Sequence, residues 1–135
     1  MKTHPDIIEN RPAWLSETIV RVLRLPEELP PRAGVEGHTL RLLKSIEADS
    51  LPVPGVCVTN RGSIRLVFES GARELHVFVT GESTFSAVRV LAGRRFPRTD
   101  VRRGRVERLR ELVAWLCPGA NGSPVQMVAG WEACG

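Results

Sequence analysis

Apolar and polar residues alternate along the middle of the chain in the manner of β-strands. Residues at every second position are apolar in two runs, Ile64, Leu66 and Phe68, then Leu75, Val77 and Val79. Turn-forming residues lie between the runs, at Asn60-Arg61-Gly62, Ser70-Gly71 and Gly81-Glu82. The pattern predicts strands over about Val56–Thr59, Ser63–Ser70, Arg73–Thr80 and Thr84–Leu91, each paired with its sequence neighbour in an antiparallel meander.

The two faces of this predicted sheet differ in polarity. The apolar runs form one face, and the other face is mixed, with Arg65, Val67, Glu69, Glu74, His76, Phe78 and Thr80. An antiparallel sheet with one dry face needs a cover on that face. We expect the last helix of the chain to supply it.

The C-terminal part has the clearest helical pattern. Its apolar residues follow helical spacing and form one stripe, Val106, Leu109, Leu112, Val113 and Leu116. Thr99 or Asp100 could cap its start, and Pro118-Gly119 would end it. The pattern predicts a helix from Val101 to Cys117.

Two helices are expected before the meander. In the first, Asn10 is the expected cap and Pro26 the end, and Leu15, Ile19, Val22 and Leu23 recur at helical spacing. Residues 18–25 also alternate loosely, so a strand stays open as the alternative there. The proline-rich segment Leu25–Gly37 is expected to be a loop, and a second short helix should begin near His38 or Thr39.

These elements predict an α+β fold. It has an N-terminal helix or helices, a three- to four-stranded antiparallel meander, and a C-terminal helix packed on one sheet face. Residues 13–117 should form a single domain after a flexible N-terminus over residues 1–12. Residues 118–135 form a tail that could add a strand or become ordered on a partner.

The segment from Leu51 to Val79 follows the pattern LPxPxVxxxxxGxIxLxFxxGxRELxVxV. It resembles small, mostly uncharacterised bacterial proteins from GC-rich genomes, over roughly Leu40 to Leu116. Such proteins often have Trp where this chain has Phe68, and Trp-Asp-Gly where it has Val35-Glu36-Gly37. The resemblance implies a helix, a β-meander and a C-terminal helix, and it implies no activity or catalytic residue.

Composition narrows the class of protein. The chain has 135 residues, 42% of them hydrophobic, and no apolar run near the roughly 18 residues that span a bilayer. We therefore expect a cytoplasmic protein with no membrane contact. The three cysteines, Cys57, Cys117 and Cys134, are too few for a disulfide framework, so they should be reduced, with Cys57 and Cys117 buried as small hydrophobic residues.

Positive charge is concentrated in one segment. Residues 94–110 contain eight arginines and two acids, a local net charge of +6 in a chain whose total is +4. The candidate contacts for an anion or a partner crowd the start of the expected C-terminal helix, where the helix dipole disfavours cations: Arg94, Arg95, Arg98, Arg102 and Arg103. Three interpretations stay open, namely a solvated loop, an acidic protein partner and nucleic acid.

The chain contains no recognisable catalytic constellation. It lacks GxSxG, HExxH and glycine-rich phosphate loops, and His4, His38 and His76 fall in three different segments. Neither a cofactor signature nor a metal-ligand spacing is present. We therefore expect a non-enzymatic binding or accessory protein that acts through a protein partner or as a homodimer, with Val67, His76 and Phe78 as candidate sheet-face contacts. The alternatives are a nucleic-acid-binding regulator using residues 94–110 and an enzyme with an unrecognised site.

Overall fold

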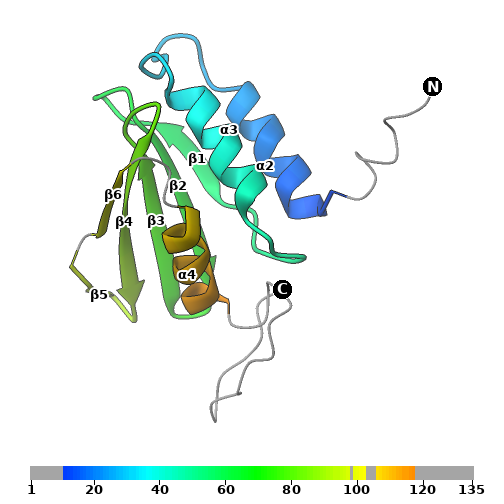
Figure 1. Cartoon of the computed structure of the whole chain (residues 1–135), viewed down its shortest axis with the longest axis vertical. Helices are drawn as coiled ribbons and strands as arrows, with labels where there is room; N and C mark the ends of the chain where they lie inside the picture. Colours follow the sequence, from blue (N-terminus) through cyan, green and yellow to red (C-terminus); the bar gives the residue numbers. More distant parts are fainter. Residues whose placement is uncertain (1–10, 98, 103–105, 118–135) are drawn as a thin grey trace.

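One antiparallel sheet with helices on a single side forms the body of the molecule (Figure 1). A computed structural model describes the backbone of residues 11–97, 99–102 and 106–117, and the side chains of these residues except 99–102. The elements follow in the order α2 (Ala13–Leu23), α3 (Val35–Ser45), β1 (Gly55–Val58), β2 (Ile64–Ser70), β3 (Arg73–Val79), β4 (Thr84–Leu91), β5 (Arg94–Arg95), β6 (Thr99–Arg102) and α4 (Val106–Leu116).

The predicted meander is confirmed, and the predicted strand number is too low. Strands β1 to β4 pair in sequence order, and their bounds lie within one residue of those expected. Within the described residues the sheet has six strands, because β5 and β6 both pair with β4. Strand β5 follows a two-residue turn in which Ala92 and Gly93 both have positive φ, 51° and 84°. This geometry matches the right-handed twist of a hairpin.

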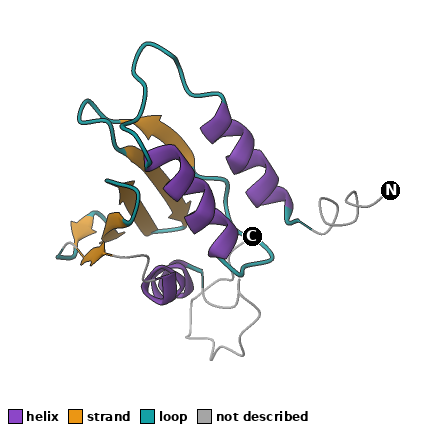
Figure 2. Cartoon of the chain, turned by 45° about the horizontal axis from the view of Figure 1, so that its top comes forward, coloured by secondary structure: helices purple, strands orange, loops and turns teal. Residues whose placement is uncertain are grey.

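The core lies between the helices and one face of the sheet, and Figure 2 shows the helices together on that side. The expected apolar positions of the strands are all buried, including Phe68, Leu75 and Val79 at 0% exposure, whereas Leu23 of the first helix is 59% exposed. Helices α2, α3 and α4 all contribute side chains to the same cluster. The C-terminal helix therefore covers only part of the apolar face, and the N-terminal helices cover the rest.

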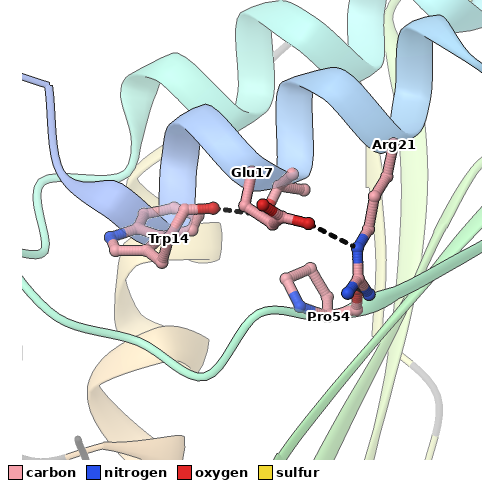
Figure 3. A network of polar contacts seen from close by, with 5 residues as sticks. Trp14, Glu17, Arg21 and Pro54 are labelled. Carbon is pink, nitrogen blue, oxygen red and sulfur yellow. Dashed lines mark hydrogen bonds and ion pairs between the residues drawn. The ribbon is translucent and has the colours of Figure 1, made fainter.

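Helix α2 resolves the open alternative for residues 18–25 in favour of a helix, which ends at Leu23. Its N-cap position is Pro12, so the expected cap at Asn10 is wrong. Arg21 ties the helix to the chain before β1, because it donates to the Pro54 carbonyl at 3.0 Å (Figure 3). Arg21 also pairs with Glu17 of the same helix at 3.5 Å. Trp14 Nε1 donates to the Ala48 carbonyl at 2.9 Å. These bonds hold α2 against the entry to the sheet.

The other two helices differ from the expected bounds. Helix α3 begins at Val35, one turn before the expected start, because Gly34 takes a left-handed conformation with φ of 84° at its N-cap. A Cβ at Gly34 would lie 2.6 Å from Glu82 Cβ, so glycine is also required sterically. Helix α4 begins at Val106 and not at Val101, because residues Thr99–Arg102 pair with β4 as β6. Neither Thr99 nor Asp100 can therefore cap it. The expected N-terminal segment and C-terminal tail lie largely or wholly outside the described residues.

Candidate functional site

The sheet face opposite the helices carries the three candidate sheet-face residues close together. The register places Val67 directly opposite His76, and places Arg65 directly opposite Phe78. All four side chains are half-buried. We call this surface the open face, formed by three rows that cross the strands: Cys57, Arg65, Phe78 and Ser86; Gly55, Val67, His76 and Val88; and Glu69, Glu74, Val90 and Arg95.

A polar network runs through the centre of the open face. Arg65 Nη2 donates to His76 Nδ1 at 3.0 Å, and His76 Nε2 donates to Glu74 Oε1 at 2.9 Å. A guanidinium offers only donors, so Nδ1 must be the acceptor and the imidazole is neutral with its proton on Nε2. The Arg65 guanidinium also lies 5.6 Å from the centroid of the Phe78 ring. The charges of Arg65 and Glu74 are therefore linked through one neutral histidine.

Two further residues of the first row depart from ordinary sheet surfaces. Cys57 is exposed and free, so the expectation that it is buried is wrong; it lies opposite Arg65 on the edge strand β1. Ser86 lies beside Phe78 and is 4% exposed, and its Oγ has no hydrogen-bond partner among the described residues. Cys117 is buried as expected, but it takes part in a disulfide, so the expectation that all cysteines are reduced is also wrong.

Of the five candidate arginines, the three that the structure describes lie in strands and not at a helix start. Arg94 and Arg95 form β5, with exposed side chains. Arg102 belongs to β6, and Arg98 and Arg103 lie outside the described residues. The argument from the helix dipole is therefore wrong for the three that the structure places. A hollow of about 400 Å³ lies at this edge of the sheet, lined by Leu91, Arg94, Arg95, Phe96 and Pro97.

Beside this hollow two arginines are stacked on aromatic rings. The Arg89 guanidinium lies 4.7 Å from the Phe96 centroid and 5.6 Å from that of Trp115. The Arg73 guanidinium lies 5.0 Å from the Trp115 centroid, and its Nη1 donates to the Trp115 carbonyl. That carbonyl is in the last turn of α4, where carbonyls lack helical partners and the helix dipole is negative. Burial lowers the pKa of Arg73 from its ordinary value.

We call the group Arg73, Arg89, Arg94, Arg95, Phe96 and Trp115 the basic corner. Sequence analysis identified Arg94 and Arg95 but missed Arg73, Arg89 and Trp115 as members of one cluster. A signal for two of them exists in the sequence. Arg73 lies two residues before Leu75, and Arg89 lies two residues after Ala87. Both arginines therefore occupy the sheet face that packs against the helices, where the alternation predicts apolar residues.

His38 is a structural residue in the fold and lies on neither surface. It is 3% exposed, and its Nδ1 donates to the Gly81 carbonyl at 2.8 Å, which ties α3 to the turn before β4. In the part of the chain that the structure describes, its Nε2 is buried without a hydrogen-bond partner. Burial lowers the pKa of His38 below its ordinary value of 6.5, with a smaller contribution from the charge of Arg41 and some opposition from the Gly81 and Thr84 hydrogen bonds. The imidazole is therefore neutral.

The described residues form neither a metal-binding cluster nor a membrane-spanning helix. They contain no group of three or more His, Cys, Asp or Glu side chains placed to hold a metal ion. None of the helices in this part of the chain has the length and apolar character needed to cross a membrane. No family model, curated protein or solved structure matches the chain. The geometry of the two surfaces is therefore the basis for a functional proposal.

Proposed function

We propose that this protein is a small non-enzymatic binding protein, and that its working surface is the open face. The observation that supports the proposal is that all three described helices pack on the opposite side of the sheet. The open face keeps Val67 and Phe78 half-buried around the Arg65–His76–Glu74 network. Arg65 Nη2, both ring nitrogens of His76 and Glu74 Oε1 already have hydrogen-bond partners, so covering these atoms costs less than burying unpaired charges. Arg65 Nε is buried without a hydrogen-bond partner among the described residues.

The occupant that best fits this face is a second copy of the same chain. Arg65 and Glu69 lie two residues on either side of Val67 along β2. A two-fold axis along the row of Gly55, Val67, His76 and Val88 would place Val67 against the partner's Val67. The same axis would place Arg65 against the partner's Glu69, an exposed carboxylate with no ion pair among the described residues. The face is therefore self-complementary in charge, as an isologous interface requires.

Sedimentation equilibrium of the full chain over a range of concentrations tests this proposal. Val67→Arg should give a monomer, because each copy would bring a cation to the two-fold axis. Val20→Arg is the matched control: Val20 is on α2 and 42% exposed, on the helical side of the molecule. A wild-type monomer at all concentrations would overturn the proposed dimer, and so would equal weakening by the two substitutions.

A second candidate is a nucleic-acid-binding regulator that uses residues 94–110. The observation that favours it is the basic corner, where exposed Arg94 and Arg95 lie next to Phe96. Arginines beside an aromatic ring are typical of sites for single strands. A gel-shift titration with single-stranded and duplex DNA at low salt tests it, and absence of any shift would exclude it.

A further inference from the structure

The hollow at the β4–β5 hairpin has the dimensions and lining of a small-molecule site. Its volume of about 400 Å³ falls within the roughly 300–1,000 Å³ of ligand pockets. It is formed by a continuous stretch of the chain, from Leu91 at the end of β4 to Pro97 after β5. The tight turn at Ala92-Gly93 and the pairing of Leu91 with Arg94 hold both sides of this stretch in place.

Positive charge dominates the lining and the wall behind it. Arg94 and Arg95 line the hollow, and Arg89 and Arg73 lie behind it on the rings of Phe96 and Trp115. In the described part of the chain no carboxylate pairs with Arg89, Arg94 or Arg95. The Arg89 Nε is buried without a hydrogen-bond partner among the described residues. The hollow therefore favours an anionic group.

An aromatic ring in the lining adds a second requirement. Phe96 makes a T-shaped contact with Trp115, with centroids 6.1 Å apart and rings inclined at 66°, and it also contacts the guanidinium of Arg89. The Phe96 amide donates to the Arg89 carbonyl at 2.9 Å, which fixes the backbone at this point. A ring held in this way is preorganised for stacking with a planar group of a ligand.

We propose that this hollow binds a nucleotide, with the phosphate on Arg94 and Arg95 and the base against Phe96. The same chemistry is offered by a free mononucleotide and by one nucleotide of a single strand. An anion without a ring would use the arginines alone, and a neutral ring would use Phe96 alone. Arg95 pairs with Val90 and so extends the third row of the open face, whereas the proposed two-fold axis lies along the row of Val67 and His76. The site therefore lies beside the axis of the proposed dimer and not on it.

Isothermal titration calorimetry of the full chain with AMP, inorganic phosphate and an oligo(dT) strand tests the proposal. AMP should bind at least about tenfold more tightly than inorganic phosphate, because stacking adds to the phosphate contact. Replacing both arginines, Arg94→Gln with Arg95→Gln, should weaken AMP by about tenfold or more, as expected for lost charge-assisted hydrogen bonds. Phe96→Leu should bring AMP close to inorganic phosphate. Arg61→Gln, at an exposed turn residue between β1 and β2, is the matched control and should leave all three affinities unchanged.

The source of the nucleotide follows from comparison of the ligands. Tighter binding of the strand than of AMP identifies a single strand, and its logarithmic salt slope should be shallower by about 0.7 in the double variant, because one phosphate is no longer neutralised. Binding of AMP alone identifies a free nucleotide and removes the second candidate function while leaving this site intact. The proposal is overturned if neither nucleotide probe binds, if Phe96→Leu has no effect, or if a phosphopeptide binds more tightly than both.

Discussion

The open face and the basic corner both expose arginines beside aromatic rings, but they balance charge differently. On the open face Arg65 is linked to Glu74 through the neutral imidazole of His76, with bonds of 3.0 and 2.9 Å. In the basic corner Arg89 is stacked on Phe96 and Trp115, and no described carboxylate pairs with it. The first surface is suited to a partner of similar polarity, whereas the second is suited to an anion. The difference shows that a count of arginines does not locate a site, because the partners of each guanidinium decide what it can bind.

Replacing Arg73 should cost the most stability, because in the basic corner this side chain also supports the fold. Arg73→Ala removes the hydrogen bond to the Trp115 carbonyl and the stacking on its ring. We expect the free energy of unfolding to fall by about 2–3 kcal/mol, the sum of a charged hydrogen bond and a cation–π contact. Urea denaturation measures it. Arg73→Lys should recover part of the loss, and an unchanged midpoint would show that Arg73 does not support α4.

The two surfaces also show what the sequence can and cannot predict. Strict alternation through Ile64–Phe68 and Leu75–Val79 predicted the strands and the open face, because period two places residues on one side without long-range information. The register then places Arg65 opposite Phe78 and Val67 opposite His76, so that Arg65 is diagonal to His76. Strand β5 was missed because Ala92-Gly93 is a weak hairpin signal, and β6 because its pairing with β4 is a tertiary preference that competes with helix propensity. The contact of Trp115 with Arg73 joins residues 42 apart, so no local pattern contains it.

Acid should weaken the scaffold that carries both surfaces, through His38. Its pKa is lowered in the folded state, so the unfolded chain binds a proton at a pH where the folded chain does not. Stability from this group is complete above pH 6.5 and is lost as the pH falls toward the folded pKa, by at most about 1.4 kcal/mol for each pH unit. Denaturation curves between pH 7.5 and 5.5 measure the slope. His38→Gln should abolish this contribution, and an identical slope in the two proteins would assign the pH dependence elsewhere.

His76 should contribute less to stability than Arg73 does, because its bonds are partly exposed to water. His76→Ala should lower the free energy of unfolding by about 1 kcal/mol, since it breaks two hydrogen bonds on a face where solvent can replace them. A double-mutant cycle with Glu74→Ala should give a coupling of about 0.5 kcal/mol, measured by urea denaturation. A loss larger than that of Arg73→Ala would reverse the proposed contrast between the two surfaces.

Added salt should change the stability of the dimer formed through the open face only slightly, which is the smallest effect expected. It should weaken AMP binding at the basic corner more. Between low and physiological ionic strength, the dimer dissociation constant should change by about threefold or less, because its charges are paired within and between copies. The affinity of the basic corner for AMP should fall more steeply over the same range. Sedimentation and calorimetry in matched buffers compare them. Equal salt dependence would contradict the distinction between paired and unpaired guanidinium groups.

The pairing of two open faces is tested most directly by mixing two charge-reversed variants, Glu69→Arg and Arg65→Glu. In the proposed arrangement each variant alone sets like charges against each other across the two-fold axis, whereas a mixed pair restores opposite charges at both contacts. Sedimentation equilibrium should therefore show monomers for each variant alone and dimers in the equimolar mixture, with thermal melts confirming that both variants fold. Dimers of each variant alone, or a mixture that stays monomeric while the wild type dimerises, would contradict the proposed interface.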